Sequence, residues 1–254
     1  MTQDSFNLTG KNALVTGSTR GLGAAIAIAL AEAGANVAVH GRSSSGEGTC
    51  SSVSQRGRQT FFISGDIADA SFCSTLVEKT IAEFGTLDIL INNAGTIRRA
   101  PAAEYSLEDW NHLIAANLSS VFRVSQFAGR HMLERSSGGK IVNIASLLSF
   151  QGGILVPAYA AAKGGVAQLT KAFANEWARY GINVNAIAPG YMETNNTQAL
   201  RNDPNRSRQI LDRIPACRWG TPQDVAGAAV FLSSPAANYI HGHVLAVDGG
   251  WLAR

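Results

Sequence analysis

The chain has 254 residues, of which 46% are hydrophobic and 15% charged, and its formal net charge is +3. This length accommodates one large α/β domain with a sizeable core. The Lys and Arg residues are scattered rather than clustered with aromatic residues, so we expect no nucleic-acid partner. No apolar run approaches the length that spans a bilayer, so we expect no membrane partner either.

Cysteine spacing and the polar first segment predict a cytoplasmic protein. Cys50, Cys73 and Cys217 are widely spaced, and no pair has metal-ligand or redox spacing. The segment Met1–Lys11 lacks the basic-then-apolar layout of a signal peptide. His241 and His243 have no third ligand at suitable spacing, so we expect no metal site.

Short apolar runs rich in β-branched residues alternate with longer helical patterns. The predicted strands are Asn12–Thr16, Asn36–His40, Thr60–Ser64, Leu87–Asn92, Lys140–Ala145, Asn183–Ala188 and His243–Val247. The predicted helices are Leu22–Ala33, Ser71–Phe84, Leu107–Leu133, Ala158–Tyr180 and Pro222–Leu232. Apolar strands that are each followed by a helix indicate a parallel sheet covered on both faces. We therefore predict an α/β fold, with residues 1–254 forming one Rossmann domain around a doubly wound seven-stranded parallel sheet.

One polar segment, residues 193–213, departs from this alternation. It contains Asn, Asp, Pro and Arg residues and a weak helical pattern beyond the sixth predicted strand. A mobile substrate lid is one interpretation, and an ordinary surface insertion is the alternative.

The first predicted strand leads into a glycine-rich turn with the sequence TGSTRGLG. Glycines at this place let the backbone approach a pyrophosphate, which then lies against the N–H groups of the following helix. A turn without a ligand is the alternative, but the position at the first strand–helix junction favours a dinucleotide. The candidate cofactor-binding residues here are Gly17, Thr19, Arg20, Gly21, Leu22 and Gly23.

The end of the second predicted strand reads His40-Gly41-Arg42-Ser43. An NAD enzyme would carry Asp or Glu here to bind the ribose 2′-hydroxyl. Arg42 is instead suited to pair with a 2′-phosphate, with Arg20 assisting from the glycine turn. The sequence therefore favours NADP(H) over NAD(H), although some sites accept both.

A Ser, Tyr and Lys set indicates carbonyl chemistry. Tyr159 and Lys163 lie four residues apart at the start of a predicted helix, and Ser146 follows a predicted strand. Hydride transfer to a carbonyl leaves an alkoxide that needs a proton, which Tyr donates as general acid. A nearby Lys⁺ lowers the pKa of that Tyr, and a Ser hydroxyl orients the carbonyl oxygen. A lone Tyr-x-x-x-Lys pair is usually a surface feature, but the combination with the glycine turn reverses that interpretation.

These motifs together resemble those of the classical short-chain dehydrogenases/reductases over essentially the whole chain. The resemblance implies that Asn117 holds a water in a proton relay to Lys163, and that Lys163 also binds the nicotinamide ribose. It implies a homotetramer as well. The further cofactor-binding residues that it implies are Asp66, Ile67, Asn93, Ala94, Gly95, Tyr159, Pro189, Gly190, Met192 and Thr194.

Residues 95–101, 145–153, 190–197 and 248–254 are similar to those of sugar-acid dehydrogenases, in particular the 2-dehydro-3-deoxygluconate 5-dehydrogenase and 2-deoxygluconate 3-dehydrogenase group. An anionic, polyhydroxylated substrate needs an Arg for its carboxylate and neutral polar groups for its hydroxyls. Predicted strand ends are flanked by suitable residues, although a solvated surface role is the alternative for each. The candidates are Arg98, Arg99, Leu148, Ser149, Gln151, Tyr191, Asn195 and Asn196.

The sequence thus predicts an NAD(P)-dependent oxidoreductase that interconverts a secondary alcohol and a ketone on a sugar acid such as 2-dehydro-3-deoxygluconate or gluconate. A 3-oxoacyl-[acyl-carrier-protein] reductase or another carbonyl reductase shares every catalytic motif and stays open. A cofactor-binding regulator without turnover is the third hypothesis. It is disfavoured because a pure binder has no chemical need for the complete Ser146, Tyr159, Lys163 and Asn117 set.

Overall fold

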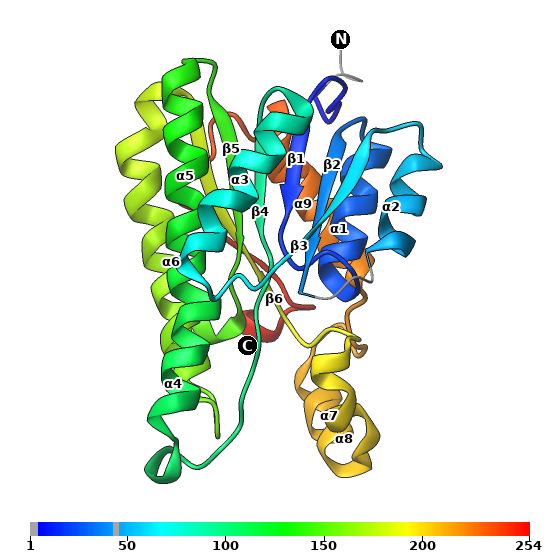
Figure 1. Ribbon diagram of the computed structural model, residues 1–254. Helices are drawn as coiled ribbons and strands as arrows, with labels where there is room; N and C mark the ends of the chain where they lie inside the picture. Colours follow the sequence, from blue (N-terminus) through cyan, green and yellow to red (C-terminus); the bar gives the residue numbers. More distant parts are fainter. Residues whose placement is uncertain (1–4, 43–45) are drawn as a thin grey trace.

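The computed structural model describes residues 5–42 and 46–254. The first four residues of Met1–Lys11 and Ser43 of the strand-end motif lie outside this description. Within the described residues, seven strands form one parallel sheet in the order β3-β2-β1-β4-β5-β6-β7 (Figure 1). The strands are β1 (Asn12–Val15), β2 (Asn36–Gly41), β3 (Thr60–Ser64), β4 (Ile89–Asn92), β5 (Gly139–Ile144), β6 (Ile182–Pro189) and β7 (Val244–Val247). The predicted doubly wound Rossmann fold is confirmed.

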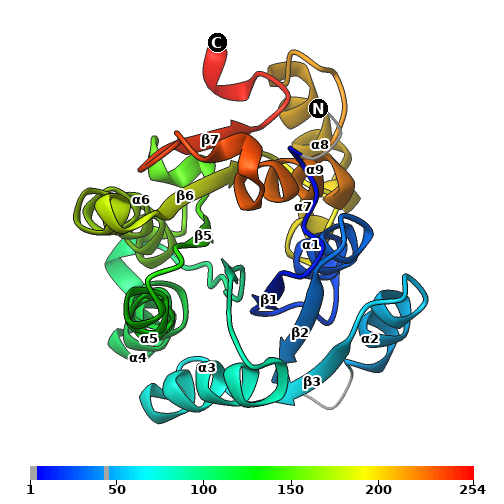
Figure 2. The same ribbon diagram turned by 90° about the horizontal axis from the view of Figure 1, so that it is seen from above.

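Helices cover both faces of the sheet, with α1, α2 and α9 on one side and α3 to α6 on the other (Figure 2). Their bounds are α1 (Gly21–Glu32), α2 (Glu47–Ser54), α3 (Ala70–Phe84), α4 (Leu107–Ile114), α5 (Ser120–Arg135), α6 (Pro157–Trp177), α7 (Gln198–Asn202), α8 (Pro204–Arg213) and α9 (Pro222–Ser233). A strand covered on both faces is mainly apolar, and β1, β4 and β6 are buried at every position. Their buried asparagines are hydrogen-bonded, namely Asn12, Asn92, Asn183 and Asn185.

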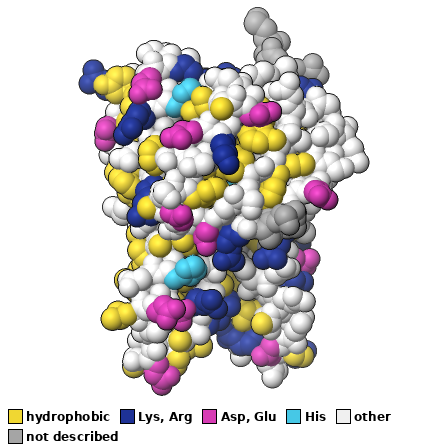
Figure 3. Space-filling model, in the orientation of Figure 1, with side chains coloured by type: hydrophobic (Ala, Val, Ile, Leu, Met, Phe, Trp, Pro, Cys, Tyr) yellow, Lys and Arg dark blue, Asp and Glu magenta, His cyan; other side chains and the backbone are white. Residues whose placement is uncertain are grey.

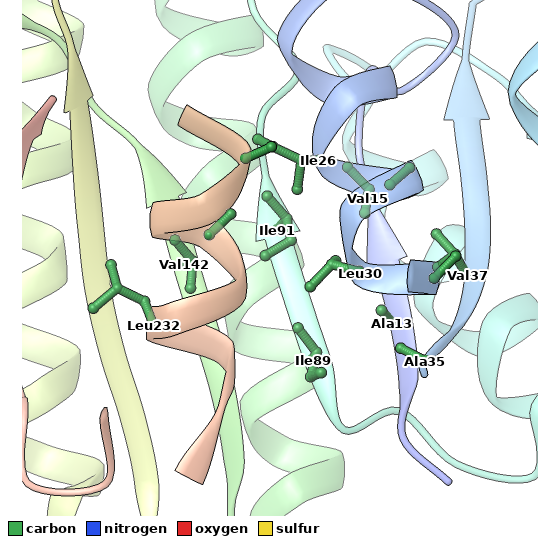
Figure 4. Packing of buried hydrophobic residues seen from close by; sticks show 14 of the residues in the cluster. Ala13, Val15, Ile26, Leu30, Ala35, Val37, Ile89, Ile91, Val142 and Leu232 are labelled. Atoms are coloured by element: carbon green, nitrogen blue, oxygen red, sulfur yellow. The ribbon is translucent and has the colours of Figure 1, made fainter. Parts of the chain in front are cut away.

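The core forms two main clusters, one on each side of the sheet. On the α1 and α9 side, Ile26, Leu30 and Leu232 pack against strand residues that include Val15 and Ile91 (Figure 4). The other cluster joins α3, α5 and α6 to the opposite face of the strands. Because both layers are fixed by this packing, the loops at the carboxyl ends of the strands are held on a rigid frame.

The predicted helix Leu107–Leu133 is wrong as one continuous α-helix. Two α-helices, α4 and α5, are joined by a π-helical turn at Ala115–Ser119. This turn contains the completely buried Asn117, whose side chain bonds the backbone of Thr96. Local π turns of this kind often occur at functional sites.

The polar segment 193–213 folds into two short helices beyond the carboxyl ends of the strands. A capping box between Thr194 and Thr197 begins the segment, and the Asp203 carboxylate caps α8 by accepting from the N–H groups of Asn205 and Arg206. Helices α7 and α8 project from the body of the molecule (Figure 1). A sequence with weak apolar periodicity is helical here because it is capped and because Ile210 is buried.

Candidate active site

The glycine turn between β1 and α1 is shaped by contacts that exclude side chains. Gly17 has φ +62°, and a Cβ there would lie 2.8 Å from the Cα of Ala94. A Cβ on Gly23 would lie 2.2 Å from the Gly17 carbonyl oxygen. The Asn93 amide donates to the carbonyls of Thr16 and Gly17, both at 2.9 Å. The loop after β4 therefore holds the glycine turn in place. Sequence reasoning identified Asn93 of this loop only through the family resemblance.

The N-terminus of α1 is open to an anion. Its N-cap residue, Arg20, makes no side-chain capping bond, and the first turn of this fully described helix has no acidic residue. The unsatisfied N–H groups and the positive end of the helix dipole therefore face the turn. This is the arrangement that binds a pyrophosphate.

His40 at the end of β2 connects three loops of this region. Its ring accepts the N–H of Gly17 at 3.1 Å through Nδ1 and bonds the Gly65 carbonyl at 3.2 Å through Nε2. The side chain is 1% exposed, and this burial lowers the pKa of His40 to about 4. A neutral ring with Nε2 protonated satisfies both bonds. Sequence reasoning did not single out His40, because only the fold brings the three loops together.

A cleft of about 590 Å³ runs along these loops. Predicted cofactor residues line it, and Gly21, Leu22, Gly23 and Asn93 shape the turn behind it. The open helix N-terminus, the glycine cradle and the basic pair Arg20 and Arg42 fit a dinucleotide with its phosphates. Thr96, His112 and Ala116 line the cleft without having been predicted. The predicted residues among the lining are Gly17, Thr19, Arg20, Arg42, Asp66, Ile67, Ala94 and Gly95.

Ser146, Tyr159 and Lys163 come together where β5 ends and α6 begins. The Ser146 side chain is close enough to that of Tyr159 to lower the pKa of the tyrosine, and both line one cavity. The Ser146 oxygen also accepts the Leu148 N–H at 3.2 Å, which fixes its position. The Lys163 ammonium donates to the Ile144 carbonyl at 2.5 Å and lies 5.6 Å from the centre of the Tyr159 ring. The helix thus presents Tyr and Lys on one face, as their spacing of four predicts.

The titration behaviour of this set follows from its burial. Burial raises the pKa of Tyr159, while the Ser146 side chain and the positive charge of Arg99 oppose that rise. Burial lowers the pKa of Lys163 from 10.5 to about 8. Tyr159 is therefore protonated near neutral pH and able to act as a proton donor. The predicted lowering of its pKa by Lys163 stays a prediction.

A second cavity of about 460 Å³ opens on Ser146 and Tyr159. Five of the predicted substrate residues line it, namely Arg99, Leu148, Gln151, Tyr191 and Asn196, together with Pro189 and Gly190. Three candidates do not. Arg98 is 60% exposed with its Nε 3.6 Å from Asp109, Ser149 donates to the Lys163 carbonyl at 2.7 Å, and Asn195 lies outside the lining.

Two cofactor candidates after β6 have mainly local contacts. Met192 is buried, and its carbonyl accepts the Thr197 hydroxyl at 2.5 Å. Thr194 forms the capping box that begins residues 195–197. These contacts fix the course of the loop, and binding of the cofactor by Met192 and Thr194 stays a prediction.

Helix α8 contributes lining residues that sequence reasoning missed. Arg206, Gln209, Ile210 and Arg213 face the cavity, and Trp251 lies opposite them. Their spacing of i, i+3, i+4 and i+7 places them on one helix face. This spacing is visible in the sequence and predicts that the four side chains share one helix face. It does not predict which part of the protein that face contacts.

Comparisons with known proteins agree with this geometry. A family model described as Enoyl-(Acyl carrier protein) reductase matches residues 17–252. The chain belongs to the short-chain dehydrogenase/reductase family, and it is an oxidoreductase that uses NAD(P).

Its relatives include sugar-acid enzymes. It is 53% identical to the 2-dehydro-3-deoxy-D-gluconate 5-dehydrogenase of Dickeya dadantii over the full length of both chains. A solved structure from Agrobacterium tumefaciens, described as a candidate 2-deoxy-D-gluconate 3-dehydrogenase with bound NADP, is 52% identical with a TM-score of 0.93. The match covers 99% of this chain and 100% of that chain. A gluconate 5-dehydrogenase from Burkholderia cenocepacia in complex with NADP and tartrate is 40% identical with a TM-score of 0.92, covering 99% and 98%.

Two further findings concern residues 5–42 and 46–254. No helix there is long and apolar enough to cross a membrane. No group of three or more His, Cys, Asp or Glu side chains there is arranged to hold a metal ion.

Proposed function

We propose that the protein is an NADP(H)-dependent oxidoreductase of a sugar acid such as 2-dehydro-3-deoxygluconate, converting a secondary alcohol to a ketone or the reverse. The observation that carries this proposal is the cavity beside Ser146 and Tyr159. Three arginines line it, namely Arg99, Arg206 and Arg213, and none of its described lining residues is Asp or Glu. Such a cavity favours an anionic substrate. The names of the full-length relatives support the same substrate class.

The proposed roles of the catalytic residues follow from their positions. A bound nicotinamide cofactor supplies or accepts the hydride. Ser146 donates a hydrogen bond to the substrate oxygen and orients it beside Tyr159. Tyr159 gives its proton to that oxygen during reduction and takes a proton from the alcohol during oxidation. Lys163 favours the tyrosinate and holds the ribose, and we assign the relay position to Asn117, which the π turn places beside Thr96.

We propose NADP(H) rather than NAD(H) as the preferred cofactor. The described end of β2 carries Arg42 and no acidic residue, and Arg20 lines the same cleft. A guanidinium pairs well with a 2′-phosphate but has no comparable partner in a 2′-hydroxyl. Arg42→Ser should therefore raise KM for NADPH about 10- to 100-fold and leave KM for NADH nearly unchanged. An equal change for both cofactors would remove this assignment.

The substrate class is tested by a rate screen followed at 340 nm. NADP⁺ and NAD⁺ are each combined with 2-dehydro-3-deoxygluconate, whose hydroxyl is the group to be oxidised. NADPH and NADH are each combined with 5-ketogluconate and with acetoacetyl thioesters, whose ketones are to be reduced. We expect turnover of a sugar acid with NADP⁺ or NADPH. Turnover confined to the thioesters would favour the acyl-carrier-protein reductase, and no turnover with any compound would favour the regulator without catalysis.

The residues 193–213 act in this proposal as a substrate lid on the single domain. The support is that Leu200, Arg206, Ile210 and Arg213 of this segment line the substrate cavity. Limited proteolysis within this segment should slow when NADP(H) and sugar acid are both present. Unchanged cleavage would leave the segment a fixed wall.

We further propose a homotetramer in the cytoplasm. Exposed apolar side chains on α4 and α5 support an interface between copies, since Leu107 is 78% and Phe122 40% exposed. Cys50, Cys73 and Cys217 are free thiols, which suits a reducing compartment. Sedimentation analysis would decide the number of subunits.

A further inference from the structure

The three arginines of the substrate cavity are not equivalent. They come from two separate parts of the chain, since Arg99 follows β4 and Arg206 and Arg213 belong to α8. In Figure 3 several Lys and Arg side chains lie around the lower middle of this face, between the parts formed by α4 and by α7 and α8. What distinguishes the three is the group that each already contacts.

Arg99 acts on the catalytic end of the cavity. Its charge lowers the pKa of Tyr159, so it lies close enough to influence the proton donor. Its guanidinium also donates to the Asn196 carbonyl at 3.3 Å, which ties it to the beginning of the lid segment. A carboxylate bound at Arg99 would cancel the charge that favours the tyrosinate. Because one of its donors is already engaged by the Asn196 carbonyl, Arg99 is less free to bind a carboxylate than an arginine without a hydrogen-bond partner.

Arg213 has the properties of a prepared anion site. Its guanidinium lies 4.0 Å above the ring of Trp251, which is 5% exposed. Trp251 is itself held by a 3.2 Å bond from its indole N–H to Gln151 and by the Tyr191 ring at 4.7 Å. Among the described residues, no hydrogen bond or ion pair engages the guanidinium of Arg213. Stacking fixes the plane of its donors and leaves them free for a ligand.

The backbone at this end of α8 is also held in place. The Arg254 guanidinium donates to the carbonyls of Asp212 at 3.0 Å and Arg213 at 3.5 Å. Ile214 immediately after the helix is buried. The backbone of Arg213 and the plane of its guanidinium are therefore both fixed before any ligand binds, which reduces the conformational entropy lost on binding.

Arg206 lies two helical turns before Arg213 on the same face of α8. Within the described residues its guanidinium donates to a neutral group, the Gln209 amide oxygen, at 2.8 Å. Both arginines are exposed, but Arg213 is in addition stacked on Trp251. Arg206 can therefore add a second cation toward a ligand held at Arg213, without being fixed in advance.

We propose that Arg213, stacked on Trp251, anchors the carboxylate of the substrate acid, with Arg206 assisting, whereas Arg99 is engaged by the Asn196 carbonyl. This inference rests on the proposed sugar-acid function. It makes the cavity two-ended, with proton transfer at Ser146 and Tyr159 and charge recognition at α8. When the substrate carboxylate is bound at α8, the length of the substrate's carbon chain determines which of its carbons lies beside Ser146 and Tyr159.

The test is a comparison of four variants with two substrates. The variants are Arg213→Gln, Arg213→Lys, Arg206→Gln and, as matched control, Arg208→Gln, which lies on α8 outside the cavity lining. The substrates are 2-dehydro-3-deoxygluconate and its neutral primary amide. Arg213→Gln should raise KM for the acid about 10- to 100-fold while kcat falls less than about threefold. KM for the amide should barely change, and Arg213→Lys should recover part of the loss.

Arg206→Gln should show the same pattern with a smaller increase, and Arg208→Gln should match the wild type. Equal loss for acid and amide in Arg213→Gln would overturn the proposal, because it would indicate a structural role through Trp251. An unchanged KM for the acid in Arg213→Gln would also overturn it, although the sugar-acid function itself would stand. Failure of the proposed function gives a different result, namely no turnover of the acid by the wild-type protein.

Equilibrium binding provides a readout that does not depend on turnover. Titration calorimetry with sodium gluconate in the presence of NADPH, which cannot oxidise this alcohol, should give a dissociation constant that rises in Arg213→Gln and is unchanged in Arg208→Gln. Sorbitol, the neutral polyol, should bind both variants alike. A gluconate affinity that is equal in wild type and Arg213→Gln would contradict an anchor at Arg213.

Discussion

The cofactor half and the substrate half of this molecule are built in different ways. Around β1, β2 and β4, the proposed cofactor site is shaped mainly by the backbone, with glycines that admit close approach, an open helix N-terminus and the Asn93 amide that locks the turn. Around β5, β6 and α8, the proposed substrate site is shaped by side chains, with Gln151, Arg213 and Trp251 arranged in one contact chain. The first half can serve many enzymes with one cofactor, and the second half can change its substrate by changing a few side chains.

Tyr159 lies where the proposed cofactor and substrate sites meet. Tyr159→Phe removes the proton donor but keeps the ring, so kcat should fall about 10²- to 10⁴-fold. Binding of NADPH and of gluconate should stay within about twofold of the wild type, because neither half has been altered. Steady-state rates and two binding titrations measure this. A large loss of binding in either titration would mean that the two halves are not separable at this residue.

Gly23→Ala tests whether the cofactor half depends on backbone approach. The new Cβ would lie 2.2 Å from the Gly17 oxygen and 2.4 Å from the Asn93 amide nitrogen, so the turn must shift. Overpacking of this kind should weaken NADPH binding roughly 10- to 100-fold, measured by fluorescence titration.

The matched control for that change is Gly227→Ala on α9, where a Cβ would meet nothing within 4 Å. This variant should bind NADPH like the wild type and be slightly more stable, since Ala favours a helix over Gly. If Gly23→Ala also bound NADPH normally, the close approach in the turn would not matter for the cofactor.

His40 gives the cofactor half a stability that depends on pH. Its pKa is about 4 in the folded protein and 6.5 in the unfolded chain, so the unfolded state binds more protons between these values. Stability from His40 is therefore complete above pH 6.5 and is lost as the pH falls toward 4. Between pH 7 and pH 5 the loss should be about 2 kcal/mol. Urea unfolding at both pH values measures it.

His40→Gln keeps a donor and an acceptor but does not titrate. Its free energy of unfolding should change less between pH 7 and pH 5 than that of the wild type, by the same ~2 kcal/mol. Groups such as His131, whose pKa is also lowered by burial, are shared by both proteins and cancel in the difference. An identical pH dependence in the two proteins would show that the ring is not held neutral by the three loops.

The smallest expected effect concerns Arg99 in the substrate half. Because its charge lowers the pKa of Tyr159, Arg99→Gln should raise that pKa. Oxidation needs the tyrosinate, so the rising limb of its pH–rate profile should move to higher pH. Arg98→Gln is the matched control, since Arg98 lies beside Asp109 outside the cavity. Profiles that coincide for Arg99→Gln and wild type would remove the electrostatic role.

The same contrast explains what the sequence could predict. The glycine turn, Ser146, Tyr159 and Lys163 are local motifs with fixed spacing, and apolar runs define the sheet, so the fold and the catalytic set are visible in one dimension. Asn117 was found through family resemblance, whereas the π turn around it was not, and its bond to Thr96 joins residues 21 positions apart in the chain. Trp251 and Arg213 meet only after β7 returns to α8, and His40 gains its partners only when three loops converge.

The most direct test follows the hydride from one half to the other. NADPH carrying deuterium at the transferable position is incubated with 5-ketogluconate, and the product is examined by mass spectrometry and NMR. We expect one deuterium on the carbon that becomes the alcohol in the product of the wild type, and almost none with Tyr159→Phe. Bound but unreacted NADPH with an unlabelled sugar acid would contradict it.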